Sequence, residues 1–175
     1  MDRSKVPTVL SIAGSDSSGG AGIQADIKTI TAHRLYAETA ITAITAQNTL
    51  GVTAVQDISP DIVAAQIDAV FDDIRPSAVK IGMVSSVEII DVIADRLSAW
   101  NATNVVVDPV MVATSGARLI AEDAAEALTR RLFPLATVIT PNIPEAMALL
   151  DYEVDSERTQ QNAAMLLTRR FGCAS

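Results

Sequence analysis

Carboxylate and amide side chains stand directly after two apolar runs of the sequence. Asp108 follows the run "NVVV", and Asn142 and Glu145 lie in "TPNIPE". Oxygen ligands of this kind suit Mg2+, which keeps several of its waters and bridges phosphate groups. The same pattern allows Asn142 to cap a helix, with Glu145 completing a capping box. The two interpretations are compatible, so these three residues form a candidate magnesium site at the ends of two expected strands.

A second candidate is the glycine-rich stretch from Gly14 to Asp26, "GSDSSGGAGIQAD", which follows the apolar run "TVLSIA". So many small residues indicate that backbone comes very close to another group. A Walker phosphate loop requires a lysine after its last glycine, and none stands there. "GAGIQA" fits a permissive dinucleotide-binding pattern, but that pattern requires an acidic residue about 20 residues further on, where Gln47 and Asn48 stand instead. The stretch also predicts a tight turn, with Ser17 or Ser18 capping the following helix.

Three polar residues near this stretch have two interpretations each. Gln47 and Asn48 are amides at the end of an expected strand, and an amide presents a donor and an acceptor together, which suits the edge of a heterocycle. The surrounding "QNTLG" is equally typical of a turn. Asp26 lies early in an expected helix, where its carboxylate either favours the helix dipole or faces the pocket and accepts a bond from a ligand.

Three further residues have side chains that could contribute to a site. Met83 follows "VKIG" and is either a flat apolar wall for a ring or a core methionine. Lys80 is expected to be a strand-end lysine that reaches solvent. His33 is expected to lie on the surface, at the C-terminal end of a helix.

The elements that must position these residues alternate between apolar runs and helical patterns. Strands are expected in residues 8–13, 37–49, 51–59, 77–83, 104–111 and 136–142, and helices in residues 21–33, 60–74, 87–100, 122–133, 144–150 and 156–171. Strand and helix alternate about five times, which predicts a parallel sheet with helices on its faces. Nearly continuous apolar strands such as "NVVV" indicate burial on both sides.

Three of these helices carry apolar residues whose spacing predicts the side that faces the core. The residues are Ile23, Ile27 and Ile30 in the first helix, Ile62, Ala65, Ala69 and Val70 in the second, and Ala163, Leu166, Leu167 and Phe171 in the last.

In a parallel sheet, ligands bind outside the carboxyl ends of the strands. Those ends are "GSDSSGG", "QNTLG", "IGM", "DPVM" and "TPN", and all are rich in polar or small residues. We therefore expect the ends to form one site in an α/β fold with a mostly parallel central sheet.

Composition excludes several classes of protein. The 175 residues suit one domain or part of one, and the net charge of -8 argues against a surface for nucleic acid or anionic membrane. The one cysteine, Cys173, allows no internal disulfide, which fits a reducing compartment. No signal peptide is expected at the N-terminus, and the longest uncharged run, residues 39–56, is interrupted by polar residues and glycine. We expect a cytoplasmic protein.

Five stretches occur in a fixed order: "IAGSDSSGGAGIQADIKT", "TAITAQNTLGV", "VKIGMVSS", "VVVDPVMVATSG" and "TPNIPEAMALL". Together they closely resemble the hydroxymethylpyrimidine/phosphomethylpyrimidine kinases of thiamine biosynthesis, over nearly the whole chain. The resemblance implies a ribokinase-like fold, a three-layer α/β/α sandwich. It also implies a homodimeric enzyme that uses ATP and Mg2+ to phosphorylate 4-amino-5-hydroxymethyl-2-methylpyrimidine and then its monophosphate.

The resemblance also implies roles for residues of the pyrimidine pocket. Backbone at Gly14 would approach the substrate, and Asp26 and Gln47 would hold its polar edges. Met83 and Val110 would pack on the ring.

For the phosphate side, the resemblance implies that Asp108, Asn142 and Glu145 hold magnesium, directly or through water. One departure is Thr114, where the family usually has a lysine, and this change is expected to weaken a phosphate contact. The family's "GTGC" segment, which supplies the anion hole and the residue proposed as base, lies downstream of residue 175, as does its "KGG" nucleotide segment. No catalytic residue is therefore assigned in this chain.

Residues 1–175 are expected to be the N-terminal, substrate-binding part of a single kinase domain. A helix closed by Gly172 is expected to lead into another strand. Two alternatives stay open: a pyridoxal kinase of the same superfamily, and a non-catalytic binding protein made from a truncated kinase. Gln47 together with Met83 favours the pyrimidine over pyridoxal.

Overall fold

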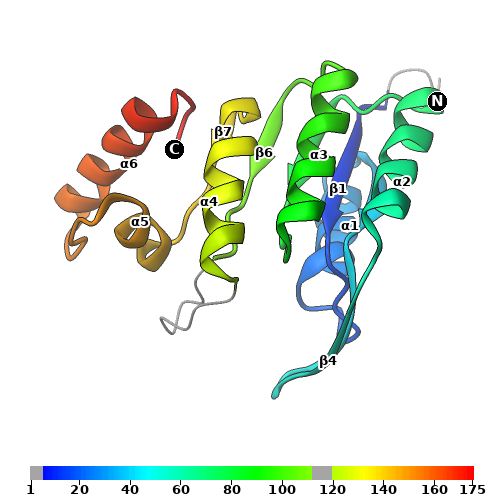
Figure 1. Ribbon diagram of the computed structural model, residues 1–175, viewed down its shortest axis with the longest axis horizontal. Coiled ribbons are helices and arrows are strands. Elements are labelled where there is room, and N and C mark those ends of the chain that lie inside the picture. The colour runs from blue at the N-terminus through cyan, green and yellow to red at the C-terminus, as the bar shows by residue number, and fades with distance from the viewer. Residues whose placement is uncertain (1–5, 112–119) are drawn as a thin grey trace.

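The computed structural model describes residues 6–111 and 120–175 (Figure 1). Within this part of the chain, the central sheet has five strands in the order β2-β1-β5-β6-β7, and all neighbouring pairs are parallel. These strands are β1 (Thr8–Ala13), β2 (Tyr36–Ile41), β5 (Ala78–Ile81), β6 (Val105–Val107) and β7 (Val138–Ile139). Two further strands, β3 (Ala43–Asn48) and β4 (Gly51–Asp57), form a separate antiparallel hairpin. The predicted parallel sheet is confirmed.

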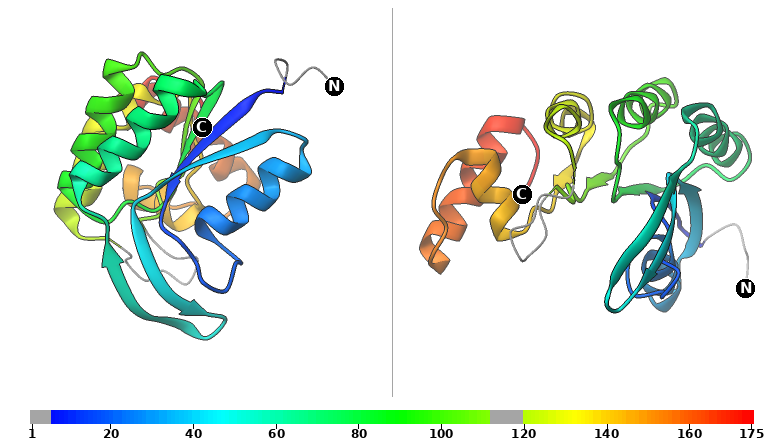
Figure 2. Two further views of the ribbon diagram at one scale, coloured as in Figure 1. Left: turned by 90° about the vertical axis from the view of Figure 1, so that its right-hand side faces the viewer. Right: turned by 60° about the horizontal axis from the view of Figure 1, so that its bottom comes forward.

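Helices cover both faces of the sheet. They are α1 (Gly22–Ala32), α2 (Pro60–Asp73), α3 (Val87–Ala99), α4 (Glu122–Arg131), α5 (Ile143–Leu150) and α6 (Glu157–Phe171), with a short 3-10 helix, η2 (Phe133–Leu135), after α4. Helix α1 lies on one face, and α2, α3 and α4 lie in a row on the other, with α5 and α6 beyond α4 (Figures 1 and 2). The alternating pattern predicts helices on both faces of the sheet, and the arrangement is the three-layer α/β/α order that the resemblance implies.

The main core lies between the sheet and the row of helices α2 to α4. Alternate residues of the strands face it, and Val79, Ile81, Val105, Val107 and Ile139 are at most 1% exposed. Helix α3 contributes the largest buried set from the helices: Ile89, Ile90, Ile93 and Leu97. Burial of these side chains holds the strands in register, which fixes the positions of the strand ends.

The single strand expected over residues 37–49 is wrong, because the chain leaves the sheet at Thr42. Thr42 is fully buried, its amide donates to the carbonyl of Ala13, and its hydroxyl donates to the carbonyl of Met83. The chain then turns away into β3 and pairs with β4, so the hairpin extends from the edge of the sheet that bears the glycine-rich stretch (Figure 2). The run of Thr and Ile residues indicates strand throughout and gives no signal of this change of direction.

The buried faces of the helices differ in part from the expectation. In α2, Ile62 is 55% exposed, and Val63, Ile67 and Phe71 form the buried face instead. Both sets have helical spacing, and the set with the larger side chains, Val63, Ile67 and Phe71, is the one that packs against the sheet. Ile27 and Leu166, at 38% and 40% exposed, were also expected inside, whereas the other predicted residues of α1 and α6 are buried or partly buried.

The chain returns to the sheet after α6. Gly172 ends this helix in the left-handed conformation, with φ of 73°. Ala174 then pairs in parallel with Val138: the amide of Ile139 donates to Ala174, and the amide of Ala174 donates to Thr137. This pairing confirms that the helix closed by Gly172 leads back into strand-like structure.

Across the part of the chain that the structure describes, no helix has the length and apolar character needed to cross a membrane.

Candidate active site at the carboxyl ends of the strands

The carboxyl ends of the parallel strands lie together at one edge of the sheet. Gly14 follows β1, Gly82 and Met83 follow β5, and Asp108 follows β6. Backbone bonds continue past the strands: the amide of Gly82 donates to Ile12, and the amide of Asp108 donates to Ile81. Neighbouring ends are thus held next to each other, as the sequence predicts for a site in a parallel sheet.

Asp16 organises the glycine loop, which we define as residues 14–22. Its side chain is buried, and its carboxylate accepts bonds from the amide and hydroxyl of Ser18 and from the amides of Gly20 and Ala21, at 2.7–2.9 Å. The expectation that Ser17 or Ser18 caps α1 is wrong, because the N-cap position is Ala21 and has no side-chain cap. Hydrogen bonds from Ser18 hold the pKa of the Asp16 carboxyl below its usual value. These amides are already occupied, so the loop is not a free nest for the phosphates of a dinucleotide.

The close approach that the glycines indicate is made by the chain itself. Gly22 has a φ of 54°, and a Cβ there would lie 2.3 Å from the carbonyl oxygen of Gly14. That oxygen accepts the amide of Ile23 at 3.0 Å, which ties the start of α1 to the end of β1. A Cβ on Gly14 would lie 2.6 Å from Cε of Met83. Two predicted site residues, Gly14 and Met83, are therefore in contact.

Gln47 lies beside the glycine loop, although its strand belongs to the hairpin and not to the central sheet. The hydroxyl of Ser17 donates to the carbonyl of Gln47 at 2.7 Å and accepts its amide at 2.8 Å. Asn48 stabilises the turn between β3 and β4, because its Oδ1 accepts the amides of Leu50 and Gly51. Of the two amides considered from the sequence, Gln47 is the one whose backbone is bonded to the loop.

Asp26 is paired with Lys80. The Nζ atom of Lys80 lies 3.1 Å from Oδ2 of Asp26, and Ser11 donates its hydroxyl to the same oxygen at 2.6 Å. The expectation that Lys80 reaches into solvent is therefore wrong, since its side chain is only 29% exposed and bonded to Asp26. The alternative in which Asp26 acts on the helix dipole is also wrong, because it lies beyond the first turn of α1.

Asp108 lies in the electrostatic field of this ion pair. Burial raises the pKa of its carboxyl, Lys80 opposes the rise, and Glu145 and Asp26 add to it. Three carboxylates and one ammonium, on α1, α5 and the ends of β5 and β6, thus influence one another. Such a concentration of interacting charges at strand ends is typical of a functional site.

Glu145 and Asn142 form the capping box of α5 that the sequence allowed. Asn142 Oδ1 accepts the amide of Glu145, and Glu145 Oε2 accepts the amide of Asn142, each at 2.9 Å. Glu145 is 1% exposed, and its Oε1 also accepts the amide of Met111 at 2.8 Å. This buried carboxylate therefore ties the segment after β6 to the start of α5.

The described residues supply carboxylate donors for the predicted magnesium ion but no complete set of protein ligands. Among residues 6–111 and 120–175, no group of three or more His, Cys, Asp or Glu side chains could hold a metal ion by itself. Mg2+ is commonly bound through one or two carboxylates together with waters and substrate phosphates. Asp108 and Glu145 both supply carboxylates, and the charge of Glu145 raises the pKa of Asp108. The site therefore suits an ion that arrives with a phosphate ligand.

Val110 has a strained backbone. Its φ is 44°, a left-handed value that is unusual for a β-branched residue. Strain of this kind persists where the surrounding structure enforces it, and it is frequent at ligand sites. Thr114, the departure noted in the sequence, lies outside the described residues.

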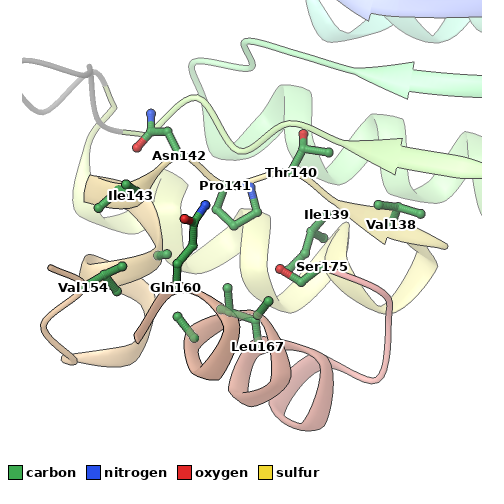
Figure 3. A pocket seen from close by; sticks show the side chains of 13 residues that line it. Val138, Ile139, Thr140, Pro141, Asn142, Ile143, Val154, Gln160, Leu167 and Ser175 are labelled. Atoms are coloured by element: carbon green, nitrogen blue, oxygen red, sulfur yellow. The ribbon is translucent and has the colours of Figure 1, made fainter. Parts of the chain in front are cut away.

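A cavity of about 380 Å3 lies between β7, α5 and α6 (Figure 3). Ile139 and Leu167 are among its apolar lining residues, and Asn142 and Gln160 contribute polar side chains. Of the predicted site residues only Asn142 lines it, so this cavity adjoins the start of α5 and not the glycine loop.

Asp16, Lys80 and Ser11 are the residues that sequence reasoning missed as members of the site. An aspartate followed by "SSGG" is typical of a side chain that bonds to backbone amides further along a turn, and this signal was available for Asp16. A lysine within the apolar run "AVKIG" is a weaker signal, because a buried lysine needs a partner.

The chain is similar to proteins of known family. A family model described as phosphomethylpyrimidine kinase matches residues 16–175. The chain is 55% identical to a hydroxymethylpyrimidine/phosphomethylpyrimidine kinase of Rhizobium meliloti (strain 1021), over 91% of this chain and 60% of that protein. It spans 60–62% of the length of that protein and of its counterparts in Salmonella typhimurium and Escherichia coli.

Solved crystal structures of related kinases are also similar to this chain. The crystal structure of phosphomethylpyrimidine kinase from Clostridium difficile 630 is 50% identical, with a TM-score of 0.88 over 94% of this chain and 71% of that chain. The ADP complex of Bacillus subtilis pyridoxal kinase is 40% identical, with a TM-score of 0.79 over 91% of this chain and 59% of that chain.

Proposed function

The chain belongs to the phosphomethylpyrimidine kinase family, and from this membership we propose that it serves the ATP-dependent phosphorylation of 4-amino-5-hydroxymethyl-2-methylpyrimidine and of its monophosphate. The observation that carries the proposal is the meeting of two sets of residues at one edge of the sheet. Met83 contacts Gly14 of the glycine loop and Gln47 is bonded to Ser17 of the same loop, while the charges of Asp26 on α1 and Asp108 after β6 lie next to them.

In this proposal the ring of the substrate lies between the glycine loop and the end of β5. Gln47 offers a donor and an acceptor to the polar edge of the ring. Met83 and Val110 pack on its faces, and the backbone at Gly14 approaches it without a side chain in the way. Asp26 accepts a bond from a ligand amine through lone pairs that Ser11 and Lys80 leave available.

Asp108, Asn142 and Glu145 would hold Mg2+ against the phosphates of ATP, directly or through water. The ion, when bound, neutralises charge that develops on the phosphates. The protein's own part includes fixing the carboxylate of Glu145, which accepts the amides of Asn142 and Met111. Phosphoryl transfer depends mainly on positioning and on charge stabilisation, so few reactive groups are needed.

We propose that residues 1–175 form the N-terminal, substrate-binding part of a single kinase domain. The relatives that match are longer than this chain. By resemblance, the anion hole and the base belong to the part of the family that follows residue 175. The 175-residue chain mixed with ATP, Mg2+ and the pyrimidine should form product far more slowly than a longer relative, measured by mass spectrometry. Equal turnover would refute this division.

Calorimetry of the pyrimidine with the chain and its variants tests the proposed substrate. Loss of a buried charge-assisted bond costs on the order of 1.5–3 kcal/mol, which is more than tenfold in Kd. Asp26→Ala should weaken binding by this amount, and Gln47→Ala, which removes a neutral bond, by about 0.5–1.5 kcal/mol. Gln56→Ala, which removes an exposed amide from the same hairpin, is the control and should bind normally. Unchanged affinity in both test variants would remove Asp26 and Gln47 from the site.

Pyridoxal is a second candidate substrate, because the chain is also similar to pyridoxal kinases. Competition between pyridoxal and the pyrimidine for one site separates the two possibilities. We expect the pyrimidine to displace pyridoxal, since Gln47 offers a donor and an acceptor to the polar edge of the aminopyrimidine. Stronger binding of pyridoxal would reverse the assignment.

We also infer a homodimer and a cytoplasmic location. The β3–β4 hairpin exposes apolar side chains, of which Leu50 is 94% and Val55 is 56% exposed. An exposed apolar strand pair is a typical association surface. Light scattering should show a dimer that Leu50→Lys with Val55→Lys dissociates. Ile62→Lys, which places the same charge on exposed α2, should leave it intact. A wild-type monomer would contradict the inference.

A further inference from the structure

The glycine loop has the form of an anion-binding site that is already filled. Three backbone amides, of Ser18, Gly20 and Ala21, converge on the carboxylate of Asp16 at 2.8–2.9 Å. Converging amides before a helix are the arrangement that elsewhere holds a phosphate or sulfate. Here the anion is a side chain of the loop itself, and it is only 2% exposed.

Charge–charge attraction does not account for this arrangement. The carboxyl of Asp16 has its pKa lowered by hydrogen bonds, first from the Ser18 side chain and then from backbone amides, against the opposing effect of burial. The nearby Lys28 donates to the carbonyl of Gly19 at 2.7 Å, on the outside of the loop. The negative charge is therefore stabilised by oriented amides and by the positive end of α1.

The residues on either side of Asp16 are bound to β3. The amide of Ser15 donates to the carbonyl of Ala43, and its own carbonyl accepts the hydroxyl of Thr45 at 2.6 Å. Ser17 exchanges two bonds with the backbone of Gln47. The loop thus runs along β3 and holds the end of the strand that carries Gln47.

Asp16 also joins this segment to α1. Its own amide donates to the side chain of Gln24 at 2.7 Å, while its carboxylate accepts the amide of Ala21 at the N-cap of α1. Asp16 therefore connects the glycine loop to the first helix, while its neighbours Ser15 and Ser17 connect the loop to the hairpin.

We propose that Asp16 is a positioning residue that acts as a built-in anion: its carboxylate fills the nest of the glycine loop and so fixes Ser15, Ser17 and the end of β3 that carries Gln47. The effect on Gln47 rests on the proposed function. The filling of the nest does not, and it is tested separately. Asp16 itself touches neither substrate nor nucleotide in this scheme.

Acetate rescue tests the filling of the nest. Asp16→Gly removes a group that acetate reproduces, so acetate should bind the emptied nest. We expect a lower Tm than in the wild-type chain, and a rise of about 2 °C in acetate relative to chloride at equal ionic strength. The control is Asp61→Gly, which removes an exposed carboxylate from the first turn of α2. A rescue that is equal in both variants, or absent in both, overturns the proposal.

Nuclear magnetic resonance on the wild-type chain keeps the test independent of any variant that fails to fold. On acidification, the amide protons of Ser18, Gly20 and Ala21 should shift together, with one common pKa below the ordinary 3.8 of an aspartate. Separate titrations, or a common pKa at or above the ordinary value, overturn the proposal.

Calorimetry then connects the loop to the substrate. In Asp16→Gly, the Kd for the pyrimidine should rise at least tenfold, and acetate should restore part of the affinity. If acetate raises the Tm while the wild-type chain does not bind the pyrimidine, the proposed function fails and the built-in anion stands. If the wild-type chain binds and Asp16→Gly binds equally well, the positioning role fails.

Discussion

Replacing Glu38 with glutamine should remove a large part of the pH dependence of stability. Glu38 lies on β2 opposite Leu10 of β1 and is 7% exposed. Neither of its carboxylate oxygens has a hydrogen-bond partner among the described residues. Burial alone raises the pKa of this carboxyl from 4.5 to about 7. The fold therefore favours the protonated, neutral form.

The sign and size of the effect follow from this pKa. Between 4.5 and about 7 the unfolded chain has lost the proton that the folded chain keeps, so stability falls as the pH rises through this window. At 1.36 kcal/mol for each pKa unit, the whole loss is roughly 3 kcal/mol. About 2–3 kcal/mol of it falls between about pH 5 and pH 8.5. Below the window Glu38 is neutral in both states and has no such effect.

Urea denaturation of the wild-type chain and Glu38→Gln at these two pH values measures the effect. The free energy of unfolding of the variant, relative to wild type, should increase by about 2–3 kcal/mol from the lower to the higher pH. The unsatisfied amide of glutamine costs the same at both and cancels. The control is Glu153→Gln at an exposed position, where the difference should not change with pH. A pH-independent difference for Glu38→Gln would refute the reasoning.

Three further outcomes are expected from the site. Gly172→Ala should cost roughly 1–2 kcal/mol of stability from left-handed strain alone, because no atom of the described residues lies near the new Cβ. Gly22→Ala should cost more, because its Cβ would also collide with the carbonyl oxygen of Gly14. Equal losses of stability in denaturation would contradict this. Lys80→Met and Asp26→Asn should show a coupling of about 1–2 kcal/mol in a double-mutant cycle, and additive losses would show that the ion pair contributes nothing. Glu145→Gln should lose about 1–3 kcal/mol of stability in the absence of Mg2+, because one buried amide donor loses its acceptor; unchanged stability would leave Glu145 with a metal role alone.

Much of the fold could be predicted because its signals are local. Apolar runs such as "TVLSIA" and "NVVV" indicate buried strands, and their alternation with helical patterns indicates a parallel sheet. The capping box of Asn142 and Glu145 is a signal within four residues, and the structure confirms it. The meeting of strand ends at one edge then follows from parallel pairing alone.

Two of the errors involve choices between neighbours that are distant in the sequence. Thr42 redirects the chain because of bonds to Ala13 and Met83, and neither partner is visible in the run of Thr and Ile residues. Helix α2 offers two apolar stripes, and only packing against the sheet selects the one with Val63. Local propensity indicates strand or helix in these segments but not the partner of each face.

By itself, the sequence determined the order of the elements, the parallel sheet and the edge at which a site must lie. Only the tertiary structure decided how the polar side chains at that edge are used. Lys80 reaches Asp26 across 54 positions of the chain, and Ser17 binds Gln47 across 30. Such bonds form because packing of the core brings the strand ends together. Hydrogen bonds and ion pairs act over a few ångströms in space, whatever the separation along the chain.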